Sequence, residues 1–147
     1  TVVDIKALRE VSGLSIMQCK SALVEAGGDK EKALSLLKKK GAEIATKKGD
    51  RTLGAGVIVS YIHAGETVGV MLELLCETDF VAKNPEFKSV AKDISMHIAA
   101  MNPSDKNELL EQPFIKDPGQ KISELISNTV QKFGERTEVG QFVRFAI

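Results

Sequence analysis

The sequence predicts an α+β protein: an N-terminal three-helix module, followed by a core in which a three-stranded antiparallel sheet packs with helices. Residues 1–41 place apolar side chains at helical spacing between capping residues and glycines. Residues 56–147 combine β-branched runs with two long helical patterns. Residues 42–55, charged and glycine-containing, are predicted to connect the two parts. A chain of 147 residues accommodates a compact domain plus a small helical module.

Three helices are predicted in the module because each has a capping residue before it and a glycine after it. These N-caps and glycines are, in order, Thr1 and Gly13, Ser15 and Gly27, and Asp29 and Gly41. Ser15 to Gln18 also reads as a capping box. Helices this short are marginal alone, so we expect them to pack together. The connector is predicted to be partly helical from Ala42 to Lys48 and then broken at Gly49.

The core begins with a predicted hairpin, in which strands from Val57 to His63 and from Thr67 to Cys76 flank Ala64-Gly65-Glu66. Because the second strand is apolar on both faces, it is expected to be central or covered on both sides. Thr78 is a natural N-cap for a short helical segment that ends at Lys83.

The rest of the core is predicted as helix, connection, helix and strand. Asn84 as N-cap and Pro85 at the first helical position begin a helix that reaches Met101. A short helical piece is expected near 108–111, a second long helix from Asp117-Pro118 to Phe133, and a last strand over 139–147.

Composition indicates a soluble globular protein, with 43% hydrophobic and 27% charged residues, and no apolar run approaches the roughly 20 residues of a membrane helix. Net charge is zero but uneven, since residues 1–52 carry eleven Lys and Arg against seven Asp and Glu. An acidic partner surface therefore suits the N-terminal part, whereas nucleic acid is disfavoured because that part has no aromatic residue to stack on bases. Cys19 and Cys76 are expected as reduced, buried thiols of a cytosol-like compartment, with a disulfide as the alternative.

No enzymatic chemistry is predicted. The stretch 49–56 lacks the Lys-Ser/Thr pair of a phosphate loop, and the Cys and His spacing does not fit structural zinc. Cys76, His63 and Asp79 make a conceivable nucleophile set, but Cys76 continues an apolar series and is expected in the core. His97 is expected to form a solvated pair with Asp93, one helical turn earlier. We therefore expect no catalytic residue, no cofactor and no metal.

The stretch after Cys76, Glu77-Thr78-Asp79-Phe80-Val81-Ala82-Lys83-Asn84, resembles the T-D-F-V-A-K-N signature of the bacterial and organellar elongation factor Ts family. That family comprises guanine-nucleotide exchange factors of elongation factor Tu. Further matches follow in the family's order, and the likeness covers essentially the whole chain. They lie at Ile5–Gly13, Ile16–Leu23, Ser60–His63, Gly69-Val70, His97–Ala100 and Leu110–Phe114.

The resemblance implies a ubiquitin-associated (UBA)-like module and a nucleotide-exchange function in protein biosynthesis, located in the cytoplasm or in an organellar matrix or stroma. It implies that Asp79 and Phe80 enter elongation factor Tu near its magnesium site, with Thr78 and Val81 shaping the wedge. The partner is bound both with GDP and without nucleotide, and no nucleic acid or membrane is involved. Spacing alone instead favours Phe80 and Val81 as core residues and Asp79 as a helix-start charge.

Further partner contacts are implied on both parts of the chain. Lys6, Arg9, Ile16 and Met17 match family contacts with the partner's nucleotide domain, and His63 matches another contact at the hairpin end. The alternatives are a solvated basic face for Lys6 and Arg9, partial burial for Ile16 and Met17, and a water-facing loop histidine.

The chain departs from the family in length. Only Ser104 to Glu108 separate two matching segments between which the family has a longer insert, and there is no room for a second core repeat or a coiled coil. A homodimer is therefore left open. Two other functions are weighed: a general UBA-like binding module on a scaffold, against which the motif order argues, and an RNA-binding translation accessory, which would require steep salt dependence of RNA binding.

Overall fold

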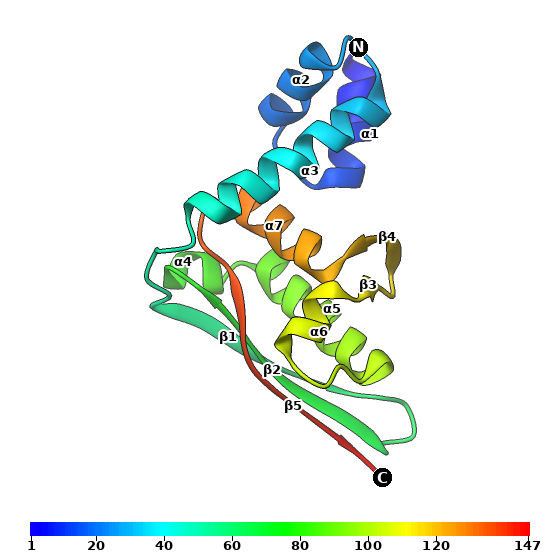
Figure 1. The fold of residues 1–147 in the computed structure, drawn as a ribbon, viewed down its shortest axis with the longest axis vertical. Helices are drawn as coiled ribbons and strands as arrows, with labels where there is room; N and C mark the ends of the chain where they lie inside the picture. Colours follow the sequence, from blue (N-terminus) through cyan, green and yellow to red (C-terminus); the bar gives the residue numbers. More distant parts are fainter.

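The computed structural model describes residues 1–147 and shows a helical module at one end of an elongated molecule, joined to an α+β core (Figure 1). The module comprises α1 (Val2–Ser12), α2 (Ile16–Glu25) and α3 (Lys30–Lys47). The predicted caps are confirmed: Thr1 and Ser15 each form a reciprocal capping box. Its separate small core consists of Leu8, Leu14, Cys19, Ala22, Leu23, Ala33 and Leu37.

Helix α3 is longer than predicted, because Gly41 does not end it. The helix continues to Lys47, so the predicted helical part of the connector is the last third of α3. Gly41 is buried where α3 crosses α7 (Ile122–Phe133), and a Cβ atom there would lie 2.8 Å from Gln131 Oε1. The glycine therefore permits close approach of two helices. In the sequence, a glycine at a helix crossing looks the same as a glycine that ends a helix.

The core sheet contains β1 (Ala55–Ile62), β2 (Val68–Cys76) and β5 (Glu138–Ala146) in the order β1-β2-β5, with both pairs antiparallel. The predicted three strands and the central position of the second are thus confirmed. Helix α5 (Pro85–Met101) packs across one face, and α7 lies between α5 and the module (Figure 1). The opposite face has no covering element, and its exposed apolar residues are Ile58, Ile62, Met71, Val143 and Phe145.

Short elements connect these parts: α4 (Asp79–Ala82), α6 (Lys106–Glu111), β3 (Pro113–Phe114) and β4 (Asp117–Lys121). The predicted helix start at Asp117-Pro118 is wrong, because these residues belong to β4 and α7 begins at Ile122. Asp117 Oδ1 instead accepts a hydrogen bond from Gly119 N at 3.3 Å, a local turn contact that competes with helix capping. None of the helices combines the length and the apolar character that crossing a membrane requires.

His97 also differs from its prediction, since it is fully buried rather than paired with Asp93. Asp93 pairs with Lys116 at 3.1 Å. The His97 ring receives the Ile115 N–H at Nδ1 (3.3 Å), so its Nε2–H donates to Gln112 Oε1 (2.9 Å). The neutral ring thereby ties α5 to the segment before β4. Burial lowers the pKa of His97, and the hydrogen bond to Gln112 opposes this only in part.

This lowered pKa predicts a pH-dependent stability. The unfolded chain binds a proton at His97 near pH 6.5, whereas the folded chain binds it only at lower pH. The contribution of neutral His97 to the free energy of unfolding is therefore complete above about pH 6.5. It is lost as the pH falls through the pKa of the folded state, by at most about 1.4 kcal/mol per pH unit. Urea unfolding between pH 5 and 7.5 measures it. His97→Gln should remove this slope and His63→Gln should keep it, and an unchanged slope in His97→Gln would contradict the assignment.

Candidate protein-binding corner

The corner after β2 contains the clearest candidate site. Strand β2 ends at Cys76, and the single turn α4 follows after two residues. Thr78 is its N-cap, as predicted, with extended backbone and a side-chain oxygen 3.4 Å from Val81 N. Asp79 occupies the first turn, where a carboxylate suits the positive end of the helix dipole.

Phe80 projects from this corner into solvent. Its side chain is 86% exposed, whereas the next two residues, Val81 and Ala82, are buried in the main core. The interpretation as a core residue is therefore wrong for Phe80 and confirmed for Val81, which anchors the turn from the inside. Because its ring has no packing role in the core, Phe80 is a candidate for contact with a partner.

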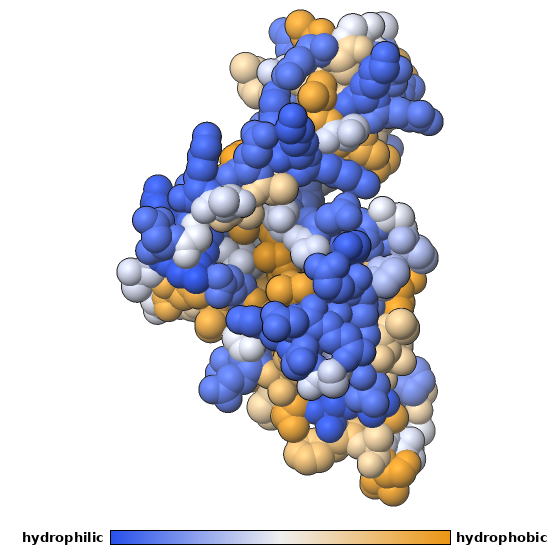
Figure 2. All heavy atoms as spheres, in the orientation of Figure 1, coloured by the Kyte–Doolittle hydropathy of each residue, from blue (hydrophilic) through white to orange (hydrophobic).

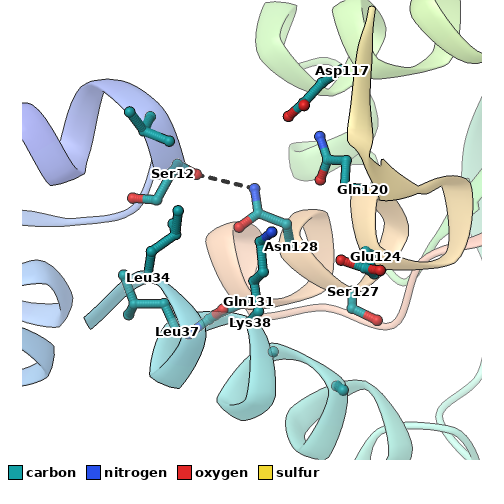
Figure 3. Close-up of a pocket in the computed structure, with 13 residues that line it drawn as sticks. Ser12, Leu34, Leu37, Lys38, Asp117, Gln120, Glu124, Ser127, Asn128 and Gln131 are labelled. Atoms are coloured by element: carbon teal, nitrogen blue, oxygen red, sulfur yellow. Dashed lines mark hydrogen bonds between the residues drawn. The ribbon is translucent and has the colours of Figure 1, made fainter. Parts of the chain in front are cut away.

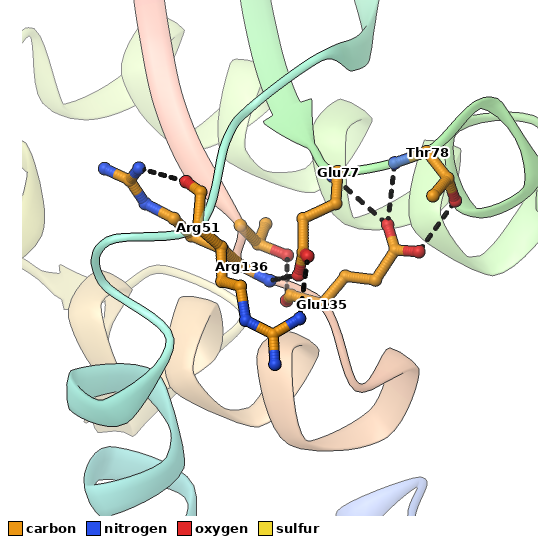
Figure 4. Close-up of polar contacts among 6 residues, drawn as sticks. Arg51, Glu77, Thr78, Glu135 and Arg136 are labelled. Carbon is orange, nitrogen blue, oxygen red and sulfur yellow. Dashed lines mark hydrogen bonds and ion pairs between the residues drawn. The ribbon is translucent and has the colours of Figure 1, made fainter.

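Glu135, from the turn between α7 and β5, holds the base of the corner (Figure 4). Its Oε1 accepts the backbone N–H groups of Glu77 and Thr78 at 3.1 and 3.0 Å. Its Oε2 accepts the Thr78 hydroxyl at 2.7 Å. These N–H groups lie beyond the last β1–β2 pair, Ala55 with Cys76, so the ladder between those strands does not supply their acceptor.

A second set of contacts joins the same two segments. The Glu77 carboxylate accepts the backbone N–H of Arg136 at 2.6 Å and also lies 3.4 Å from the Arg51 guanidinium. Arg136 in turn donates to the Arg51 carbonyl oxygen (Figure 4). It also pairs with Glu138. Glu77 and Glu135 thus each bind the backbone beside the other. Sequence analysis did not find Glu135, since only its place after the helix stop Gly134 distinguishes it.

Cys76 has a structural role at this corner. Its thiol, 3.3 Å from the Thr78 carbonyl oxygen, donates a hydrogen bond to it. Burial raises the pKa of Cys76, and the charges of Glu135 and Asp79 raise it further, so the sulfur stays protonated. His63 follows β1 at the other end of the hairpin, where Tyr61 Oη lies 2.9 Å from its Nδ1. The conceivable nucleophile set is therefore not assembled, and both cysteines are free and buried.

The other predicted contact residues are all on the surface. Lys6 and Arg9 are exposed on α1 and take part in none of the ion pairs of the structure. Ile16 and Met17 are 55% and 74% exposed at the start of α2, and neither belongs to the core of the module. His63 is exposed at the hairpin end. No group of three His, Cys, Asp or Glu side chains is arranged to hold a metal ion.

A small cavity lies between the module and α7 (Figure 3). Asn128 Nδ2 donates to the Ser12 carbonyl oxygen at 3.0 Å across it, and Lys38 and Gln131 also reach its lining. The contacts join the module to the core, and about 110 Å³ admits a few waters rather than a substrate. The exposed corner is therefore a better candidate site than this cavity.

Comparison with known proteins identifies the family. The family model described as elongation factor TS matches residues 14–108. Elongation factor Ts of Thermodesulfovibrio yellowstonii is 41% identical, over 100% of this chain and 96% of its own length. Those of Desulforamulus reducens and Thermotoga petrophila are 39% and 38% identical, over 96% and 97% of this chain and 86% and 94% of their own lengths. The chain belongs to the elongation factor Ts family.

The chain is nevertheless shorter than these relatives. The alignment with the Thermodesulfovibrio protein spans 191 positions, of which this chain occupies 147, so 44 positions have no counterpart here. The family-model match ends at residue 108, within the stretch where sequence comparison expected a longer insert. In this structure the stretch is a direct link from α5 through Asn102, with φ 45°, into α6.

Thr78 is predicted to stabilise the corner with both functions of its hydroxyl, as donor to Glu135 and acceptor from Val81 N. Thr78→Val keeps the shape and removes both hydrogen bonds, so the free energy of unfolding should fall by about 1–2 kcal/mol. Thr78→Ser keeps the hydroxyl and should lie within about 0.5 kcal/mol of the wild type. Urea denaturation measures both variants, and equal stability of Thr78→Val and the wild type would contradict this role.

Proposed function

We propose that this protein is a guanine-nucleotide exchange factor that binds elongation factor Tu and promotes GDP release during translation elongation. Membership of the elongation factor Ts family supports this role. Such a factor makes and breaks no covalent bond, so it needs no catalytic acid, base or nucleophile. It must instead bind the nucleotide-free partner more tightly than the loaded partner, so that factor and nucleotide weaken each other's binding reciprocally.

The observation that carries the proposal is the exposure of Phe80 beside Asp79 on a braced corner. We propose that these two residues enter the partner near its magnesium and nucleotide site and disturb the metal that bridges protein and phosphates. Phe80 supplies apolar area that leaves water only on binding. Asp79 brings a carboxylate close to a site occupied by a cation. Thr78 and the buried Val81 set the direction in which the pair projects.

A second contact is proposed on the UBA-like module. Lys6 and Arg9 provide positive charge, and Ile16 and Met17 provide exposed apolar surface, in the more basic part of the chain. An acidic surface with an apolar centre on the partner's nucleotide domain would fit this combination. His63 at the hairpin end is proposed as a third contact.

The proposed setting is the cytoplasm, or the matrix or stroma of an organelle if the chain is eukaryotic. The partner is engaged both in its GDP-bound state and without nucleotide. Neither nucleic acid nor a membrane belongs to this proposal, and exchange itself requires no cofactor of the factor's own.

Phe80→Ala should remove most of the exchange activity. Truncation of a central aromatic anchor should weaken binding to nucleotide-free elongation factor Tu by about 2–4 kcal/mol. The rate at which a fluorescent GDP analogue leaves elongation factor Tu, measured against factor concentration, tests this directly, and Asp79→Ala should also slow release. Because Phe80 is exposed, the binding defect of Phe80→Ala should come without a loss of stability.

Phe145→Ala is the matched control, since Phe145 is also an exposed aromatic but lies beside Gly69 at the far end of the sheet. With Phe145→Ala, GDP should leave elongation factor Tu at the same rate as with the wild-type chain. Near-wild-type release by Phe80→Ala would refute the wedge. No acceleration by the folded wild-type chain with a matched partner would refute the exchange function itself.

A homodimer is proposed as a second partnership, through the uncovered face of the sheet. This face carries Ile58, Ile62, Met71, Val143 and Phe145, and Figure 2 shows apolar residues gathered at the end of the molecule near the β1–β2 hairpin and the C-terminus. A two-fold axis would place the same patch against itself and bury all of these side chains at once. The exchange proposal does not depend on this contact.

Analytical ultracentrifugation should therefore show a dimer at tens of micromolar protein, on the order of the concentrations at which moderate interfaces form. Val143→Glu should give a monomer, because it would bury two charges at the two-fold interface. Lys88→Glu reverses a charge on α5, which packs on the covered face of the sheet, and should leave the dimer intact. A monomeric wild type under these conditions would refute the dimer.

A further inference from the structure

The corner that carries Phe80 cannot hold its own shape. Helix α4 is a single turn of four residues, too short to be stable alone. The Phe80 side chain is almost wholly in water, so it packs against little that could fix its position. Its direction therefore depends on the backbone on either side. Val81 and Ala82 anchor one side in the core, and the other side is the two residues between β2 and α4.

Those two residues, Glu77 and Thr78, are held by one carboxylate. Glu135 accepts both of their backbone N–H groups and the Thr78 hydroxyl, at 2.7–3.1 Å. Glu135 takes part in no ion pair in this structure, so its acceptor capacity goes to these contacts rather than to a surface cation. Hydrogen bonds to an ionised acceptor are stronger than neutral ones. Because the Thr78 hydroxyl proton points to Glu135, its lone pairs remain available to Val81 N, 3.4 Å away.

Glu135 is itself fixed by the fold. Gly134, with φ 71°, ends α7 and turns the chain. The backbone N–H of Arg136, which follows Glu135, donates to the Glu77 carboxylate at 2.6 Å. The α7–β5 turn and the end of β2 thus brace each other through two carboxylates, each bound to the other segment's backbone. No hydrogen bond joins Glu135 to Asp79 or Phe80, so its hydrogen bonds reach those side chains only through the backbone of the corner and the Thr78 hydroxyl.

We propose that Glu135 is a positioning residue for nucleotide exchange, which holds the Asp79–Phe80 corner in its binding shape before the partner arrives. The inference rests on the proposed exchange function and adds to it the residue that orders the wedge. Without Glu135, three donors turn to water and the base of α4 samples other conformations. The binding-competent corner is then only a fraction of the population, and the apparent rate of exchange falls to that fraction of its full value.

The test combines exchange kinetics with a double-mutant cycle on the full chain. Glu135→Ala should lower the slope of GDP release against factor concentration by about tenfold or more, the effect expected on losing charge-assisted hydrogen bonds. In a Phe80→Ala background the same change should lower the remaining slope by less than about twofold, because Glu135 acts only through the corner. A residue that merely stabilises the fold would instead give equal losses in both backgrounds.

Two further variants separate shape from charge. Glu135→Gln keeps an oxygen for the two N–H groups but presents an NH₂ group to the Thr78 hydroxyl, so it should fold and show an intermediate loss. Glu138→Gln removes a neighbouring carboxylate that binds Arg136 but not the corner, and it should stay within about twofold of the wild type, as surface changes usually do. Amide hydrogen exchange at Glu77 and Thr78 should accelerate in Glu135→Ala and not in Phe80→Ala.

These measurements distinguish failure of the positioning role of Glu135 from failure of the exchange function. If the wild type accelerates GDP release and folded Glu135→Ala and Glu135→Gln do so equally, the positioning role is refuted and the exchange function stands. Equal losses with and without Phe80, or an equal loss in Glu138→Gln, would also refute it. If the wild type does not accelerate release, both proposals fail together.

Discussion

The cross-bracing of two backbone segments by Glu77 and Glu135 is the contact on which the candidate site depends. One segment follows β2 and the other follows α7, 57 positions later than Thr78 in the chain. The β1–β2 ladder has ended by then, so the corner needs acceptors from elsewhere. The carboxylates supply them while α4 stays only one turn long. A short turn can then project Phe80 into solvent while its neighbours Val81 and Ala82 remain in the core.

The contact between α3 and α7 places the module relative to that corner. Helix α3 passes through Gly41 instead of ending there, and the missing side chain lets it approach Gln131 on α7. Helix α7 then leads through Gly134 to Glu135. One helix therefore supports both the module with its exposed Met17 and the corner with its exposed Phe80. Two contact surfaces joined in this way can engage one partner together, which raises their combined affinity without any new contact.

Family membership and structure give different kinds of support. Similarity to elongation factor Ts proteins identifies the family. The structure adds which of the expected residues can meet a partner: Phe80, Ile16 and Met17 are exposed, and Val81 is not. The chain also lacks 44 positions of its Thermodesulfovibrio relative while keeping the sheet, α5, α7 and the braced corner. The contacts that brace the proposed wedge all come from residues that this chain contains.

Features that depend on neighbouring residues could be predicted from the sequence alone. The capping residues Thr1, Ser15, Thr78 and Asn84 set helix starts through contacts within three positions, and the apolar pattern of β2 predicted its central place. Features that depend on residues far away in the chain became visible in the tertiary structure. Gly41 is a crossing point rather than a helix end, Asp117 lies in a strand, and His97 is buried against Gln112 and Ile115. The exposure of Phe80 also depends on distant residues. Its spacing favoured burial, and no local sequence pattern indicates that Glu135 braces the corner. Capping hydrogen bonds join residues that are close in the sequence, so the sequence predicts them. The exposure of a side chain instead depends on which distant segments pack together.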